Sequence, residues 1–344
     1  MYTCSCFGFA PVGAFFLLLL ISPSMASDKF RLLFFGSDIF SLKVLDGILS
    51  RQIWPVQVVT KPNSLLHHYS KKKNLRQYAW EPGIRSIDQS VFNIGLVASF
   101  GAMIDIETIT RFQYGLFNVH PSLLPTFRGS TPVQAAILNG LRETGCTIMR
   151  IPPVEKFDIG DIVLQQKLLV HEDEYARDLM LRLADLGSEM SSRLLLDFEN
   201  SIRHLVPQSD ARKSYAKKLK PEMGLLSFRT ESSTLIGRKV RAYTGFIHLY
   251  TTCWGGMRCR LSNMRNQAEV ATYRLDKLAS CDQKAQPGRV FFHKVRKTLC
   301  IKCNDGQWLA FDRISPPNKR MMNALDFYNG YMAKKDPRTH MTDV

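Results

Sequence analysis

The sequence predicts an open, mostly parallel α/β sheet of the Rossmann type, followed by a small β-barrel that is OB-like. Two patterns support this fold class. Up to about residue 200, short apolar runs alternate with helical periodicities, and beyond it short alternating segments follow one another between turns. The chain has 344 residues and so exceeds one average domain. We therefore expect two domains of different class.

The first domain begins with a strand and a helix. Residues 30–36 form a short apolar run that ends in a glycine, which indicates a buried strand and the turn after it. In residues 38–50 the apolar positions recur every three or four residues, so this stretch predicts a helix lying on that strand. A second helix is expected over 131–139, where Pro132 suits the first turn. Further strands are expected at 55–60, 94–99, 115–120 and 145–151, and the longest helix at 174–200.

The second domain is expected to hold many strands and little helix. Its short apolar-alternating segments are separated by turns with Gly, Pro or Asn, at 246–253, 289–293, 298–303 and 307–312. Residues 201–213 lack periodicity and contain Pro207, which places the linker there. The predicted division is a first domain over 29–207, a second over 208–335 and a tail over 336–344.

Residues 1–28 are treated as a targeting or non-core segment. Ala14–Ile21 is an apolar run that suits the core of a signal peptide but is too short to span a bilayer. No Lys or Arg precedes Lys29, so both the basic start of a secretory signal and the arginines of a transit peptide are missing. Initiation at Met25 would leave the predicted core intact.

The positive charge is concentrated in the second domain. The formal net charge is +16, yet residues 1–207 hold 20 Lys/Arg against 19 Asp/Glu, whereas residues 208–344 hold 26 against 11. Such asymmetry is typical of a module that binds nucleic acid or another acidic surface. The alternative is a solvated basic surface that serves solubility.

The cysteines indicate neither a metal site nor a redox centre. The eight lie at positions 4, 6, 146, 253, 259, 281, 300 and 303, and only Cys300 and Cys303 form a CxxC pair. A zinc site needs a second pair of ligands at suitable spacing, and none is present. We expect reduced thiols in an intracellular compartment.

The densest group of polar candidates starts at the end of the strand over 115–120. Asn118 and His120 are two residues apart, so they project from the same face of that strand. Open α/β sheets bind ligands at the carboxyl ends of their strands. An amide and an imidazole side by side can stabilise a developing oxyanion, and the imidazole can also exchange a proton. The alternatives are a structural histidine and an asparagine that caps a turn.

A carboxylate follows in the turn after residues 145–151. Asp158 stands two positions before a glycine, where a tight connection frees the side chain from helix or ladder constraints. Near His120 it would orient the ring, favour its protonated form and relay a proton. Asp161 begins the next strand and is less suited to catalysis. A common turn composition explains the same residues, and the residues alone do not name a reaction.

Three motifs in this region resemble those of the folate-dependent formyltransferases. They are Asn-Val-His-Pro-Ser-Leu-Leu-Pro-Thr-Phe-Arg-Gly-Ser-Thr-Pro at 118–132, Thr-Gly-Cys-Thr-Ile-Met at 144–149 and Asp-Ile-Gly-Asp at 158–161. Within this family the chain is most similar to the methionyl-tRNA formyltransferases of animal mitochondria. That narrower likeness rests on three sequence segments: Phe-Arg-Gly at 127–129, residues 214–218 and residues 317–331. The whole resemblance covers roughly residues 30–331.

The resemblance implies a reaction and a set of site residues. Asn118, His120 and Asp158 match the family's catalytic positions, for direct transfer of formyl from N10-formyltetrahydrofolate to the amine of a methionyl-tRNA. Neither a metal nor a covalent intermediate is implied. The folate would lie against Phe100, Gly101, Ser122, Leu123, Leu124 and Pro125. The family also implies a monomer in the mitochondrial matrix with no membrane association.

Basic residues are the candidates for tRNA contact. Residues 61–73 replace a glycine- and basic-rich loop that enters the acceptor stem in bacterial members, and here they lack glycine. Lys71, Lys72 and Lys73 can still neutralise phosphates, although they also read as a solvated charge run at the start of a helix. Arg128 is a further candidate for the acceptor end, unless it pairs with a carboxylate in the sheet. The candidates in the second domain are Lys217, Lys218, Lys220, Arg238, Lys239 and Arg241.

Two other functions fit parts of the pattern. Another folate-dependent formyltransferase or hydrolase that acts on a small amine would share the three catalytic residues, but its substrate affinity would be insensitive to salt. A non-catalytic RNA-binding relative would bind tRNA without transferring formyl. The intact Asn118, His120 and Asp158 set argues against the second.

Overall fold

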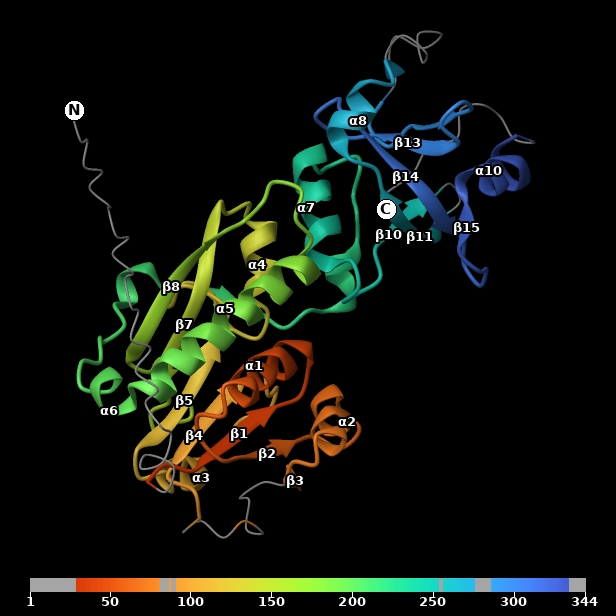
Figure 1. The fold of residues 1–344 in the computed structure, drawn as a ribbon. Coiled ribbons are helices and arrows are strands. Elements are labelled where there is room, and N and C mark those ends of the chain that lie inside the picture. Colours follow the sequence, from red (N-terminus) through yellow and green to blue (C-terminus); the bar gives the residue numbers. More distant parts are fainter. Residues whose placement is uncertain (1–28, 81–86, 88–90, 254–255, 276–285, 334–344) are drawn as a thin grey trace, which may run out of the picture.

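The computed structural model describes residues 29–80, 87, 91–253, 256–275 and 286–333 (Figure 1). The predictions for residues 1–28, for the tail over 336–344 and for Cys4, Cys6 and Cys281 lie outside these ranges. The first described half of the chain forms one sheet with helices packed on it, and the second forms a smaller antiparallel sheet. Both parts of the predicted fold class are confirmed.

The first domain is built on a seven-stranded sheet in the order β3-β2-β1-β4-β5-β7-β8. Strands β3 to β5 are parallel neighbours, and β7 and β8 continue the sheet antiparallel. Every predicted strand of this domain is present, and β3 was not predicted. The bounds are β1 Leu32–Gly36, β2 Val56–Thr60, β3 Gln77–Ala79, β4 Ile94–Ala98, β5 Gly115–His120, β7 Glu143–Arg150 and β8 Ile162–Leu169.

Apolar side chains cover the sheet on both faces. Leu32 and Phe34 of β1 belong to one buried cluster, while Leu33 and Phe35 belong to another, because successive side chains of a strand point to opposite faces. A strand buried on both faces reads as an unbroken apolar run, which is why β1 is visible in the sequence.

Helices of the first domain cover these clusters. A capping box of Asp38 and Ser41 starts α1, and α1 packs along α5, the predicted long helix. Gly47 lets the two helices approach, since a Cβ there would lie 1.7 Å from Ser188 Oγ. The bounds are α1 Ile39–Ser50, α2 Leu65–Lys72, α3 Ile106–Thr110, α4 Pro132–Leu138, α5 Ala176–Leu196 and α6 Phe198–Ser201.

The second domain is a curled antiparallel sheet in the order β10-β11-β14-β13-β12, with β15 on β14. In the described residues β10 and β12 stand at opposite ends of this order, so the sheet is an open half-barrel. The four predicted strand segments are confirmed, and β11 was missed. The bounds are β10 Tyr250–Cys253, β11 Met257–Met264, β12 Val290–His293, β13 Thr298–Lys302, β14 Trp308–Ser315 and β15 Met322–Asn323.

The expectation of little helix in the second domain is wrong for α7, Ser233–Tyr243, which packs against α4 of the first domain. Its buried face includes Ile236 and Val240, one helical turn apart. The shorter helical segments here are η3 Pro221–Gly224, α8 Gln267–Ala271, α10 Ala324–Phe327 and η5 Tyr328–Met332, and η2 Asp210–Arg212 lies in the linker.

The segment between the domains lies on the first domain. Val206 bridges Ile162 at the start of β8, and β9 (Tyr215–Ala216) pairs in parallel with β6 (Arg128–Gly129). The predicted linker over 201–213 therefore crosses the first domain beside the Asp158 loop.

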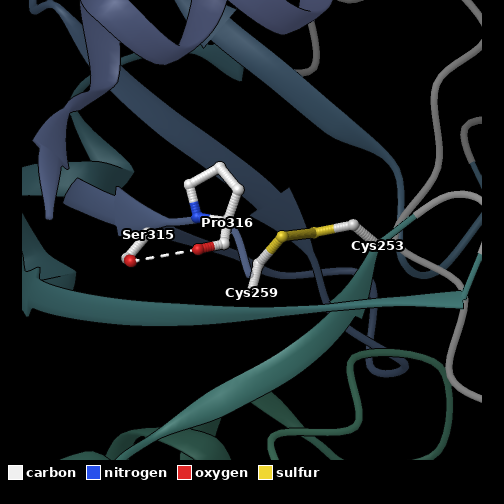
Figure 2. Close-up of a disulfide and its surroundings, with 4 residues drawn as sticks. All are labelled: Cys253, Cys259, Ser315 and Pro316. Carbon is white, nitrogen blue, oxygen red and sulfur yellow. Dashed lines mark hydrogen bonds between the residues drawn. A yellow bond between two sulfur atoms is a disulfide. The ribbon is translucent and has the colours of Figure 1, made fainter. Parts of the chain in front are cut away.

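Two cysteines depart from the expected reduced state. Cys253 and Cys259 form a disulfide between β10 and β11, close to the end of β14, where Ser315 Oγ donates a hydrogen bond to Pro316 O at 3.2 Å (Figure 2). Cys146, Cys300 and Cys303 are free and buried. Burial raises the pKa of the Cys300 thiol to about 12. Among the residues that the structure describes, no helix is long and apolar enough to cross a membrane.

Candidate active site

Asn118, His120 and Asp158 meet at the carboxyl end of β5. His120 is 4% exposed and Asn118 is half-buried on the same face of the strand, as predicted. Asp158 reaches them from the loop between β7 and β8. Asn118 Nδ2 donates to Asp158 Oδ1 at 3.2 Å, and His120 Nδ1 lies 3.7 Å from the same oxygen. The structure thus brings together the three side chains that the sequence predicted to act together.

A glycine amide holds the other oxygen of Asp158. Gly129 N donates to Asp158 Oδ2 at 2.8 Å. Gly129 has a φ of +116°, and a Cβ there would lie 2.6 Å from Ala216 O of β9. Only glycine combines this backbone conformation with so close an approach. The glycine after Arg128 is therefore part of the site, a role that the sequence motif did not reveal.

The ring of His120 is fixed by a backbone carbonyl. Its Nε2 lies 3.0 Å from Phe127 O. Because a carbonyl only accepts, Nε2 carries the hydrogen and donates. Nδ1 is then the ring nitrogen directed at Asp158. This contact sets the orientation of the imidazole before any ligand binds.

The loop Ser122–Pro125 is held from β7 and β8. Thr147 Oγ1 donates to Ser122 O at 2.6 Å and accepts from Leu124 N, while Gln165 Nε2 donates to Leu124 O. Ser122 Oγ is engaged with Thr126 O at 2.6 Å. Ser122 and Leu124 are buried. Thr147 and Gln165 shape this loop and were not foreseen.

A cleft of about 90 Å³ opens beside Asn118 and Asp158. Apart from these two and Lys156, the lining is apolar: Ala102, Met103, Ile104, Ile109, Met149, Ile151, Pro152, Val154 and Phe157. None of the six expected folate contacts is among them, although Gly101 directly precedes the lining. Phe100 is 2% exposed and packs on Phe35 and Trp80. An apolar cleft that ends on an amide and a carboxylate offers contacts to an apolar group with a polar edge.

The lysines expected to contact tRNA from the first domain are exposed. Lys71, Lys72 and Lys73 lie at the end of α2 and not at the start of a helix. Cations stabilise the C-terminal end of a helix dipole, which accounts for their place there. Lys73 also lies 3.5 Å from Asp46.

Arg128 and Lys239 are engaged inside the protein. Arg128 is 4% exposed and pairs with Asp210 at 3.1 Å, so it pairs with a carboxylate of the linker and not of the sheet. Lys239 Nζ pairs with Glu231 and donates to Leu225 O at 3.0 Å.

The other five basic candidates of the second domain divide by exposure. Arg238 and Arg241 are half-buried, and a Cβ on Gly140 would meet the Arg238 guanidinium. Lys217, Lys218 and Lys220 are exposed and follow β9 directly. These three lysines therefore present free charge next to the segment that contacts the Asp158 loop.

Two family models match the chain. A formyl transferase model matches residues 51–195, and a model of the formyl transferase C-terminal domain matches residues 218–332. The boundary between the two matches falls close to β9.

The chain is similar to named proteins of animals and bacteria. It is 31% identical to the mitochondrial methionyl-tRNA formyltransferase of Homo sapiens over 314 residues, which cover 88% of this chain and 78% of that protein. It is 27% identical over 317 residues to a methionyl-tRNA formyltransferase of Leptospira interrogans, across 87% of this chain and 96% of that one.

Solved structures share the fold. A crystal structure of HypX from Aquifex aeolicus in complex with tetrahydrofolic acid gives a TM-score of 0.60 at 16% identity, over 88% of this chain but about half (47%) of HypX. WlaRD, a sugar 3N-formyl transferase solved with dTDP and 5-N-formyl-THF, gives 0.57 at 19% identity, over 85% of this chain and 99% of WlaRD.

Proposed function

Because the chain belongs to the formyl transferase family, we propose that it transfers the formyl group of N10-formyltetrahydrofolate to the amine of a methionyl-tRNA, giving the formylated initiator for translation. The observation that carries this proposal is the meeting of Asn118, His120 and Asp158, of which Asn118 and Asp158 line the apolar cleft. These are the groups that acyl transfer to an amine requires: oxyanion donors and a proton acceptor.

The folate, when bound, supplies a formyl carbon that an amine can attack. Asn118 Nδ2 keeps a second hydrogen beside the one that it gives Asp158, and it can donate this hydrogen to the formyl oxygen as that atom gains charge. His120 Nδ1 can donate as well once the ring carries a hydrogen on both nitrogens, since Nε2 already donates to Phe127 O. Asp158 accepts from Asn118 and from Gly129 N, which holds its carboxylate beside both donors. It can take the proton that the attacking amine loses as the new C–N bond forms, and it can return a proton to the folate nitrogen N10 as the bond between N10 and the formyl carbon breaks.

The apolar lining fits the folate part of the donor. Met103, Ile104, Val154 and Phe157 offer the contacts of a flat ring system, and the only charged groups of the lining are Lys156 and Asp158. The expected contacts with Phe100, Gly101 and the Ser122–Pro125 loop remain predictions. Of these, Gly101 directly precedes the lining, and the loop is held by Thr147 of β7 and Gln165 of β8.

The exposed lysines support a nucleic-acid acceptor. Lys71 and Lys72 at the end of α2, and Lys217, Lys218 and Lys220 after β9, offer exposed charges that can meet phosphates. Lys73, the next residue after α2, is exposed as well but lies 3.5 Å from Asp46. A small-amine substrate would need none of them. Mitochondrial relatives at about 30% identity support a location in mitochondria, and a monomer is expected.

One assay tests the proposal against both rivals. The full chain is mixed with N10-formyltetrahydrofolate and either methionyl-tRNA or free methionine, and formylated product is measured by chromatography. We expect formylation of methionyl-tRNA with a KM that rises with salt. Equal use of free methionine would support the small-amine enzyme, and binding of tRNA without any transfer would support the non-catalytic relative.

A further inference from the structure

The loop that carries Asp158 has little packing of its own. Residues 153–157 are all exposed. Asp158 itself has a φ of +54°, in the left-handed region that non-glycine residues seldom occupy. Such a conformation persists only where surrounding groups impose it. The contact from Gly129 fixes the carboxylate, and a second group must fix the backbone.

That second group is the amide of Gln208, a residue of the segment between the domains. Its Nε2 donates to Asp158 O at 3.0 Å and to Gly160 O at 2.7 Å. Its Oε1 accepts from Arg128 Nε at 3.1 Å and from Arg128 Nη2 at 2.9 Å. Every hydrogen-bonding capacity of the amide is thus used.

These partners allow one orientation of the amide. A carbonyl only accepts and a guanidinium only donates, so the nitrogen faces the Asp158 loop and the oxygen faces Arg128. Arg128 is anchored in turn: Nη1 bonds Asp210, and its backbone N donates to Ser214 O at 2.9 Å. The segment between the domains therefore forms hydrogen bonds with the Asp158 loop through Gln208 Nε2 and with Arg128 of β6 through Gln208 Oε1.

We propose that Gln208 is a positioning residue for formyl transfer, which acts by holding the Asp158 backbone so that the carboxylate faces Asn118 and His120. Arg128 orients Gln208 for this task and does not contact the acceptor. The inference rests on the proposed function. On this inference, the segment between the domains not only connects them but also helps to position a catalytic group.

The test compares Gln208→Glu with the wild-type full chain. Glutamate keeps the shape and pairs with Arg128 even more strongly, but places an oxygen against the two carbonyls of the loop. We expect kcat to fall about 10- to 100-fold, as expected when two hydrogen bonds to a site backbone are lost, with KM for methionyl-tRNA and for folate within about threefold. Gln208→Met, which cannot bond the loop either, should lose kcat to a similar extent.

Gln166→Glu is the matched control. Gln166 lies on β8 and also accepts from an arginine, Arg193 Nη1 at 3.3 Å, but does not contact the Asp158 loop. Its variant should keep the wild-type kcat. Thermal unfolding of each variant is measured beside activity, and rates are taken well below the lowest Tm.

A double-mutant cycle separates positioning from a structural role. If Gln208 acts through Asp158, the single-turnover rate of the double variant Gln208→Glu with Asp158→Asn should lie within about threefold of the rate of Asp158→Asn alone. If the rate of the double variant falls by the product of the two single losses, the inference is overturned. A normal kcat in Gln208→Glu would also overturn it, even if Gln208→Met were impaired. A wild-type chain that transfers no formyl would instead defeat the proposed function itself.

Discussion

Replacing Asp158 with asparagine perturbs the site with the least change in shape. The carboxylate accepts from Gly129 N with one oxygen and from Asn118 Nδ2 with the other. An amide has a single oxygen, so it can serve only one of these donors and turns an NH₂ group towards the other. If the oxygen keeps Gly129, the NH₂ group faces Asn118 Nδ2, which loses its acceptor, and His120 no longer lies beside a carboxylate.

The expected magnitude follows from these contacts. A hydrogen bond to a charged group contributes about 1.5–3 kcal/mol. Two N–H groups that face each other without an acceptor cost further free energy. A total of about 2–4 kcal/mol corresponds to a factor of about 30–1000 in rate. Removing the proton acceptor affects the same carboxylate, so the two losses overlap and do not multiply; general acid–base catalysis contributes about 10²–10⁴-fold and sets the upper end. We therefore expect kcat to fall by about 10² to 10⁴.

Single-turnover formylation of methionyl-tRNA with excess enzyme measures this loss directly. The KM for methionyl-tRNA should change little, because Asp158 lies at the cleft and not among the exposed lysines. Asp161→Asn is the control, since the Asp161 side chain is exposed. Its backbone oxygen, which the substitution leaves in place, accepts from Arg150 N. A kcat within about threefold of wild type for Asp158→Asn would refute the role assigned to the carboxylate.

Gly129→Ala should lower the free energy of unfolding by about 2 kcal/mol and reduce kcat, since its Cβ would meet Ala216 O; denaturant titration measures the first. Asp305→Asn should destabilise the second domain near neutral pH. Burial alone would raise the pKa of Asp305, but hydrogen bonds from Ser233 hold it below its ordinary value. The stability from this carboxylate is present above the unfolded pKa of about 3.9 and is lost as pH falls through the folded pKa, so unfolding curves of variant and wild type should converge in acid. Replacing Lys217, Lys218 and Lys220 with serine should raise the KM for tRNA. The slope of log KM against log salt concentration should fall by about 2 to 3, because three phosphate contacts are lost.

Each of these has an outcome that would contradict it. An unchanged unfolding curve for Gly129→Ala would mean that β9 moves away without cost. A constant difference between Asp305→Asn and wild type down to pH 2 would show that the effect does not come from titration. An unaltered salt slope in the triple lysine variant would place the tRNA on another surface.

The sequence predicted what depends on local periodicity. β1 and β4 are buried on both faces, so each reads as an apolar run. Asn118 and His120 could be paired because the repeat of a strand is two residues. By contrast, β11 buries only Cys259 and Leu261 of its eight residues, which is too weak a signal to distinguish it from a turn. The helix α7 is amphipathic, with Ile236 and Val240 buried one turn apart, so its signal was present in the sequence although it was not predicted.

What could not be predicted depends on contacts between distant segments. The cleft is lined from residues 102–109, 118 and 149–158, which meet only after the sheet has formed. Arg128 counted as one more positive charge in the sequence, yet it is buried against Gln208 and Asp210. Charge counting cannot separate such an arginine from an exposed lysine.

The most direct test of the central claim is transfer of labelled formyl from N10-formyltetrahydrofolate to methionyl-tRNA by the purified full chain. The wild-type protein should label the amine of the methionine, and a chain with Asn118→Ala, His120→Ala and Asp158→Asn together should not, while still binding tRNA. Absence of label with the wild-type protein, or equal labelling by the triple variant, would contradict the assignment of this site.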